Sequence, residues 1–322
     1  MSSSAEGARR AARAPRILCA GIIVLDEVFR VAEFPQADTK VEAKQHFIVN
    51  GGCAANAAVA IARLGGVAAL AGPLGGPAGE DDNGDLVLRA LARENVDTSA
   101  CQRVPGLATA LSAIFINARG ERTIVTYREE GIAAATPDDP QALVAAADLV
   151  LADNRYPAFV TPICAAARAR GVPVVLDGDK ATVADDPLFR LASHIIFSSE
   201  CLRATTGCDD LAAGLARIAE RNGAFLAVSD GPGDILFLDD GACRRVPVFA
   251  IDAVDTLGAG DALHGGFALA LAEGQGEVAA LRFGAVVAGI KCSRIGGSAG
   301  APTRAEVDAF LAKDGAAVEA RG

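Results

Sequence analysis

The residues best suited to do chemistry stand together over Val254–Gly266, in the sequence Val-Asp-Thr-Leu-Gly-Ala-Gly-Asp-Ala-Leu-His-Gly-Gly. Two glycines, Gly258 and Gly260, precede the carboxylate of Asp261 at the start of an expected helix over 262–272. Backbone amides at a helix N-terminus bind anions, and glycines let a phosphate approach them closely. A carboxylate beside such a site can act as a general base. The combination predicts transfer of a phosphoryl group to a hydroxyl.

The same residues also have a purely structural interpretation. Glycines are common in turns, and Asp is a favoured helix N-cap. The apolar segment 246–251 reads as a strand, which gives the order strand, glycine turn, helix. A Gly-x-Gly on its own is weak evidence for function. The full string from Asp255 to Asp261, Asp-Thr-x-Gly-Ala-Gly-Asp, is much more specific.

Two stretches near the N-terminus carry further polar groups. The sequence Asn50-Gly-Gly-Cys-Ala-Ala-Asn56 precedes an expected small-residue helix over 57–64. Paired glycines and an Asn suit a polyol, which needs short donors and acceptors at close range, although a tight turn before a helix also explains them. Asp26 follows the apolar run 16–25, which we expect to be one buried strand. Open α/β sheets bind ligands at such strand ends, but an ordinary turn residue would explain Asp26 equally well.

Together these stretches resemble the two signatures of the ribokinase-like (PfkB-type) carbohydrate kinases, and the resemblance extends from Arg16 to Leu311. It implies that Asp261 deprotonates the acceptor hydroxyl. It also implies an anion hole made by the amides of Gly258, Ala259 and Gly260. The sugar ligands that it implies are Asp26, Gly51, Gly52 and Asn56.

The resemblance further implies ATP and Mg²⁺ as cofactors. The residues that it places at the nucleotide are Ser229, Gly231, Gly233, Thr256, Gly258 and Gly260. Asp255 matches a position that helps to bind a monovalent cation in several members, which leaves K⁺ open as a third cofactor. The family motif Asn-x-x-Glu is absent: Ser198 and Cys201 stand in its places, with Glu200 one residue away. The magnesium ligands therefore stay open.

Several segments resemble the ketohexokinase and sulfofructose kinase branch most, namely 24–26, 120–124, 151–155, 175–179 and 291–297. The implied activity is ATP-dependent phosphorylation of the primary alcohol of a ketose such as fructose or sulfofructose. The alternatives are ribose, a keto-deoxy sugar acid or a nucleoside as acceptor, and a catalytically silent sugar- or nucleotide-binding regulator. Arg155 is a candidate to grip an anionic substrate group, with a surface ion pair as the equal alternative. Lys40, on the expected lid, is a weaker candidate.

Composition excludes other classes of function. With 322 residues and a net charge of −10, the chain is not expected to bind nucleic acid or anionic membranes broadly. Eight scattered cysteines and three histidines argue against a zinc site and favour buried thiols in a reducing cytoplasm. No apolar run is long enough to span a membrane, and residues 1–15 read as a short disordered tail.

The elements that must position these residues follow from the alternation of apolar strands and helices after Gln141. This order predicts a mostly parallel sheet covered on both faces. The resemblance implies a three-layer α/β/α domain over 16–315 with a small β-sheet lid, built from about 28–49 and 108–128. It also implies a homodimer formed through the lid, and a lid that excludes water when it closes.

Overall fold

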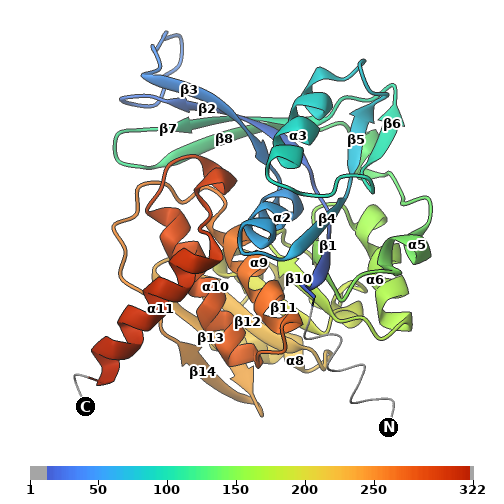
Figure 1. The fold of residues 1–322 in the computed structure, drawn as a ribbon. Helices are drawn as coiled ribbons and strands as arrows, with labels where there is room; N and C mark the ends of the chain where they lie inside the picture. Colours follow the sequence, from blue (N-terminus) through green and yellow to red (C-terminus); the bar gives the residue numbers. More distant parts are fainter. Residues whose placement is uncertain (1–12, 320–322) are drawn as a thin grey trace.

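The main sheet of the protein has eight strands. A computed structural model describes residues 13–319, so most of the expected tail over 1–15 lies outside the described residues (Figure 1). The strand order is β14-β13-β12-β11-β10-β9-β1-β4. The six neighbouring strands β4, β1, β9, β10, β11 and β12 pair in parallel, whereas β13 and β14 pair antiparallel, which confirms a mostly parallel sheet. The bounds are β1 Arg16–Ala20, β4 Val67–Ala71, β9 Leu149–Asp153, β10 Val174–Gly178, β11 His194–Ser198, β12 Phe225–Asp230, β13 Gly233–Asp239 and β14 Ala242–Val246.

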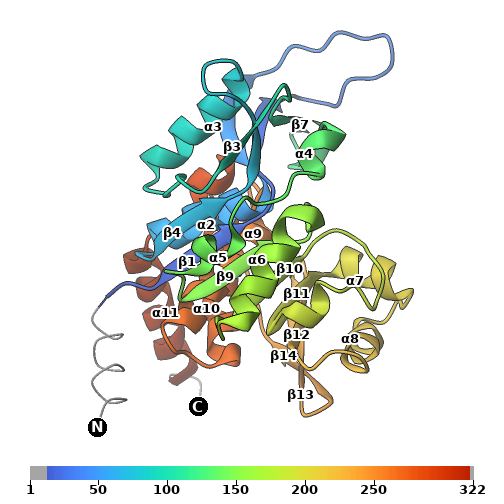
Figure 2. The same cartoon turned by 90° about the vertical axis from the view of Figure 1, so that its right-hand side faces the viewer.

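Helices cover both faces of this sheet, as the two cartoon views show (Figures 1 and 2). One face carries α2 Cys53–Arg63, α9 Ala259–Ala272, α10 Glu277–Cys292 and α11 Arg304–Glu319; the other carries α5 Pro140–Val144, α6 Pro157–Ala169, α7 Ser199–Thr206 and α8 Leu211–Ala219. Successive side chains of β1 point to opposite faces of the sheet. Ile17 and Cys19 therefore pack in the core on one face, and Leu18 and Ala20 in the core on the other. The three-layer α/β/α prediction is confirmed.

A second, four-stranded sheet, which we call the lid sheet, lies above one end of the main sheet in Figure 1. Its order is β3-β2-β7-β8, with bounds β2 Val24–Arg30, β3 Gln45–Gly51, β7 Ala110–Ile116 and β8 Arg122–Tyr127. Strand β2 pairs antiparallel with β3 and parallel with β7. The remaining elements near it are β5 Pro73–Gly76, β6 Gln102–Pro105, α3 Asp82–Arg93 and α4 Glu130–Ala133.

The expected first strand over 16–25 is wrong, because the chain changes sheet within it. Strand β1 ends at Ala20, and β2 starts at Val24 in the lid sheet. Asp26 therefore lies inside a lid strand, opposite Val49 and Ser112, and not at the edge of the main sheet. Both halves of the run are buried and apolar, and only Gly21, with φ 154° just after β1, marks the break.

The expected strand over 246–251 is also wrong. Strand β14 ends at Val246, and residues 247–258 form an irregular connection to α9. Pro247 has no amide hydrogen with which to continue the ladder. The glycine signature is thus presented by a loop and a helix rather than by a strand, a turn and a helix.

The cysteines and the character of the helices also bear on the sequence predictions. All eight cysteines are free, with Cys19, Cys164 and Cys201 buried. Within residues 13–319, no helix combines the length and the apolar character that crossing a lipid bilayer requires.

Candidate active site

Polar side chains gather where the parallel strands of the main sheet end. Asp153 is the last residue of β9, Asp177 lies one residue before the end of β10, and Ser198 ends β11. Because the carboxyl ends of parallel strands meet at one edge, these residues share the position at which open α/β sheets bind ligands.

Asp261 lies in the first turn of α9 and is the expected base. The side-chain amide of Asn56, in α2, donates a hydrogen bond to Asp261 Oδ2 at 2.7 Å. Burial raises the pKa of Asp261 to about 7, although the bond from Asn56 lowers it. A carboxylate that titrates near neutral pH is well matched to accept a proton from an alcohol. The structure thus brings together two residues that were predicted from separate motifs.

A chain of side-chain hydrogen bonds fixes the orientation of Asn56. Its Oδ1 accepts from Asn50 Nδ2 at 3.2 Å, and Asn50 Oδ1 accepts from the hydroxyl of Ser298 at 3.2 Å. The amide nitrogen of Asn56 must therefore face Asp261. Sequence reasoning missed the roles of Asn50 and Ser298, although Asn50 stands inside the predicted motif.

With Asp261 as the base that the resemblance implies, kcat/KM for a sugar should rise with pH through about 7, because a base must lose its proton before it can act. Asn56→Ala removes a hydrogen bond that lowers the pKa of Asp261, so the rise of kcat/KM should occur at higher pH. The loss of this bond should also lower kcat/KM about tenfold. Steady-state rates between about pH 5 and pH 9 measure both effects. An acid limb that stays in place in Asn56→Ala would contradict the coupling.

The N-terminus of α9 offers amides to an anion. Gly258 caps the helix with φ 77°, and a Cβ there would lie 3.7 Å from Asp261 Oδ2, so the cap lies beside the base. The amide of Ala259, expected to be part of the anion hole, instead donates to the carbonyl of Thr256 at 3.2 Å. The next two amides, of Gly260 and Asp261, have no acceptor within the helix, and the positive end of the helix dipole adds to their field.

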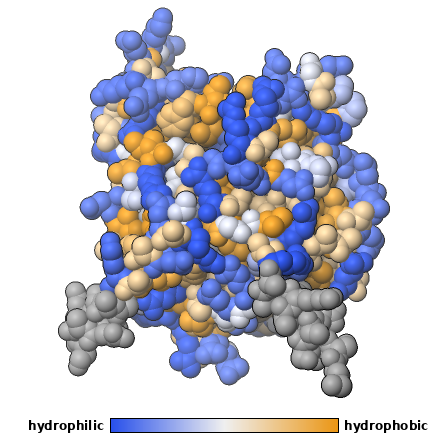
Figure 3. All heavy atoms as spheres, viewed as in Figure 1, coloured by the Kyte–Doolittle hydropathy of each residue, from blue (hydrophilic) through white to orange (hydrophobic). Residues whose placement is uncertain are grey.

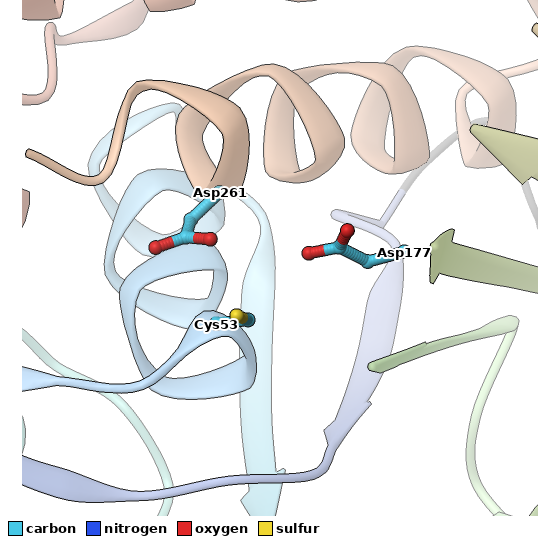
Figure 4. Close-up of side chains that lie close together, drawn as sticks. All are labelled: Cys53, Asp177 and Asp261. Carbon is cyan, nitrogen blue, oxygen red and sulfur yellow. The ribbon is translucent and has the colours of Figure 1, made fainter. Parts of the chain in front are cut away.

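Cys53, Asp177 and Asp261 converge from α2, β10 and α9 (Figure 4). One ligand atom of each lies within 4.8 Å of the others. Burial, with repulsion from Asp179 and Asp261, raises the pKa of Asp177 well above its ordinary range. Burial and Asp261 also raise the pKa of the Cys53 thiol.

This trio does not suit magnesium. Mg²⁺ takes oxygen ligands, and a protonated thiol is a poor ligand for it. Sequence reasoning missed Cys53 and Asp177 as site residues, although a carboxylate at the end of the apolar run 172–177 could have indicated the latter.

Asp153 ties three segments together below the site. Its Oδ2 accepts from the amides of Ile22 at 2.8 Å and Ala54 at 3.2 Å, and its Oδ1 accepts from the amide of Arg155 at 2.9 Å. Burial raises the pKa of Asp153 to about 6, and these amides lower it. The carboxylate therefore joins the connection between β1 and β2, the first turn of α2 and the residues just after β9.

Asp153→Ala should lower the free energy of unfolding by about 3–5 kcal/mol at neutral pH, since three buried amides would lose an ionised acceptor. Asp153→Asn keeps an oxygen acceptor and should lose clearly less. Urea denaturation at pH 7.5 to 8 (roughly the range in which the carboxylate is ionised) measures both variants. Equal stability of the Ala variant and the wild type would contradict this role.

Arg155 is engaged by a neighbouring carboxylate. Its Nε donates to Asp179 Oδ2 at 2.8 Å, and its terminal nitrogen contacts the same oxygen. The ion-pair alternative for Arg155 is thus the one that the geometry favours. Lys40 is exposed in the 31–44 loop between β2 and β3, which projects from the lid sheet in Figure 2.

Asp26 and the paired glycines meet at the inner end of the lid sheet. Burial raises the pKa of Asp26 to about 6, and a hydrogen bond from Ser112 lowers it. Gly51 lies so close that a Cβ on it would stand 2.1 Å from Asp26 Oδ2. Gly52 caps α2 with φ 95°, and a Cβ there would clash with the Ile22 carbonyl. The two glycines thus let the backbone pack closely against the Asp26 carboxylate and against the Ile22 carbonyl.

The expected nucleotide residues lie in two places. Ser229, one residue before the end of β12, pairs with Ser198 of β11; Gly231 lies in the turn into β13, which starts at Gly233. Thr256 lies in the loop before α9, where Arg122 of the lid strand β8 donates to its hydroxyl.

Ser198, at the place of the missing family Asn, accepts from the Cys201 amide at 3.2 Å and so caps α7; Glu200 is exposed.

Asp255, the expected cation ligand, ties two loops together. Its Oδ1 accepts from the amide of Leu257 at 2.8 Å. Its Oδ2 accepts from the amides of Gly296 and Gly297 at 3.0 and 3.2 Å. The carboxylate therefore shapes the loop that leads to Gly258.

Comparisons with known proteins agree with this geometry. Residues 14–304 match the model of the pfkB family carbohydrate kinases. A ribokinase from Haemophilus influenzae is 28% identical over 299 residues, covering 90% of this chain and 96% of the relative. A fructokinase from Klebsiella pneumoniae is 29% identical over 239 residues, covering 69% and 76%. The structure of an Arabidopsis thaliana ribokinase complexed with ribose and ATP has the same fold, with a TM-score of 0.81 and 24% identity over 93% of this chain and 99% of that one.

Proposed function

Because this chain belongs to the pfkB family of carbohydrate kinases, we propose that it transfers the γ-phosphate of ATP to the primary alcohol of a neutral sugar. The observation that carries the proposal is the position of Asp261. This base has a pKa of about 7, accepts a hydrogen bond from Asn56 and lies in the same helical turn as the free amides. A base and an anion site in the same helical turn are what phosphoryl transfer to an alcohol requires.

The roles follow from the contacts. Asp261 accepts the proton of the attacking hydroxyl, and Asp26, Gly51, Gly52 and Asn56 hold the sugar around it. The amides of Gly260 and Asp261 and the dipole of α9 stabilise the charge on the transferred phosphate. The turn of Ser229, Gly231 and Gly233, together with Thr256, binds the nucleotide. Mg²⁺ bound together with ATP would supply positive charge to neutralise the phosphates.

The acceptor is neutral because the site is rich in carboxylates. Asp153 and Asp179 raise the pKa of Asp261, and together with Asp261 they also raise the pKa of Asp177. The guanidinium of Arg155, the cation proposed for an anionic group, is already paired with Asp179. A sulfonate or a carboxylate on the sugar would meet net repulsion. Ribose is the first acceptor that we propose, in line with the ribokinase relative, and fructose is the second.

ADP release with Mg-ATP tests the proposal against ribose, fructose, sulfofructose, adenosine and a keto-deoxy sugar acid. We expect the highest kcat/KM for ribose or fructose, and phosphorus NMR of the product should place the ester on the primary carbon. A signal confined to sulfofructose would overturn the neutral acceptor and make Arg155 an anion ligand. Silence across the panel, with a sugar-induced melting shift, would favour a non-catalytic binding protein.

We also propose that two copies pair through the outer face of the lid sheet. Val125 and Tyr127 in β8 are 63% and 60% exposed, and Ile48 in β3 is 44% exposed. Apolar residues are visible at the top of the molecule in Figure 3, where Figure 1 places the lid sheet. Val125→Glu should give monomers in analytical ultracentrifugation, whereas Val183→Glu, equally exposed but outside the lid sheet, should not. A monomeric wild type would refute the pairing.

A further inference from the structure

Lys291 is a lysine with no solvent exposure, and it lies in the last turn of α10. Its ammonium donates to the backbone carbonyl of Asp255 at 2.8 Å and lies 3.5 Å from Asp255 Oδ1. Lysines are almost never fully buried unless they are paired with an opposite charge. Burial lowers the pKa of Lys291, and Asp255 opposes that shift. Lys291 and Asp255 therefore form a buried ion pair.

The two loops that carry functional residues meet around this ammonium. One is the loop before α9, in which the amides of Val254 and Asp255 donate to the carbonyl of Cys292 at 2.8 and 3.1 Å. The other follows α10, and its amides at Gly296 and Gly297 donate to the carboxylate of Asp255. A single positive charge thus compensates the carboxylate that holds both loops.

A separate monovalent cation does not fit at Asp255. The ammonium already occupies the side on which the carbonyl and carboxylate oxygens of Asp255 converge. The same carboxylate also accepts three backbone amides. A K⁺ ion on these oxygens would lie against the ammonium in a buried, weakly screened place.

We propose that Lys291 is a built-in substitute for a monovalent cation, so that this kinase needs no K⁺. An ammonium group and K⁺ carry the same charge and are of similar size. The charge of Lys291 acts through Asp255, whose carboxylate holds the amide of Leu257 and so sets the turn into Gly258. Lys291 is therefore a positioning residue for the amides at the start of α9.

Activity in different salts tests the proposal. At constant ionic strength, the wild type should work equally well in potassium, sodium and tetramethylammonium chloride. In tetramethylammonium, Lys291→Ala should lose at least about tenfold in kcat, because the buried carboxylate loses its counter-charge. K⁺ should restore much of this loss by entering the vacated space. Lys291→Met fills that space without a charge and should not be rescued.

Thermal unfolding gives a readout that needs no sugar, so it stands even if the proposed acceptor is wrong. K⁺ should raise the Tm of Lys291→Ala by several degrees relative to tetramethylammonium and leave the wild type unchanged. Lys313→Ala, at an exposed lysine in α11, is the control and should respond to no cation.

Activation of the wild type several-fold by K⁺ would overturn the proposal, as would a Lys291→Ala variant that keeps full activity in tetramethylammonium. Should that variant fail to fold, its refolding yield in K⁺ against tetramethylammonium replaces the activity comparison. A K⁺-specific gain in yield supports the proposal, and equal yields contradict it. The comparison of wild-type activity in the different salts tests the proposal without any variant.

Discussion

Asp261→Asn should lower kcat for sugar phosphorylation by about 10³-fold while leaving the Kd for ATP within about twofold of the wild type. The amide cannot accept the proton of the attacking hydroxyl, but it keeps the shape of the side chain. The residues proposed to bind the nucleotide are unchanged in this variant. Steady-state ADP release and calorimetric titration of a non-hydrolysable ATP analogue measure the two quantities. Near-normal turnover would show that another group is the base.

The stability of the same variant distinguishes a lost base from a damaged fold. Burial raises the pKa of Asp261 from 3.8 to about 7. A carboxyl with a raised pKa contributes stability below its ordinary pKa and loses it as the pH rises through about 7. The wild type should therefore weaken over this window, and Asp261→Asn should be at least as stable at pH 8 (a value about one unit above the folded pKa).

Asp252→Asn is the matched control for these measurements, because it removes an exposed carboxylate from the loop before α9. It should change neither turnover nor the pH dependence of unfolding. If it lowers turnover as Asp261→Asn does, the loss reports loop charge and not proton transfer.

The sequence could predict the groups in this site but not their partners. A short string such as Asp-Thr-x-Gly-Ala-Gly-Asp determines a helix start and the position of a carboxylate, because both depend on neighbouring residues. The bond from Asn56 to Asp261 joins residues 205 positions apart, and no local pattern encodes it. Asp153 and Asp177 reach the site through the order of parallel strands, which the alternation of elements leaves undetermined.

The wrong predictions have the same origin. Apart from Arg16 and Gly21, the run over 16–25 is apolar, so its hydrophobic pattern does not indicate that the chain changes sheet after Ala20. That change depends on Asp153, which accepts the amide of Ile22 from 131 residues away. Lys291 stands in a helix that is apolar on most of its surface, and only the tertiary contact with Asp255 shows it to be buried.

Gly51→Ala should lower kcat/KM for the sugar by about 100-fold and leave the Kd for ATP unchanged. Gly51 lies in a β-strand without a positive φ, so alanine suits its backbone. The added methyl group would stand 2.1 Å from Asp26 Oδ2, so the carboxylate must shift from its position. The expected loss is that of a charged hydrogen bond to the sugar, with only a modest cost in stability.

A double-mutant cycle tests this cause directly. If Gly51→Ala acts only by displacing Asp26, then Asp26→Ala should cause a similar loss, and combining the two should add little to it. Gly276→Ala, at a glycine with open space around its missing Cβ, should be neutral. Losses that multiply in the double variant would mean that the methyl group blocks the sugar itself. Non-additive losses would identify the carboxylate of Asp26 as the group that Gly51 leaves room for.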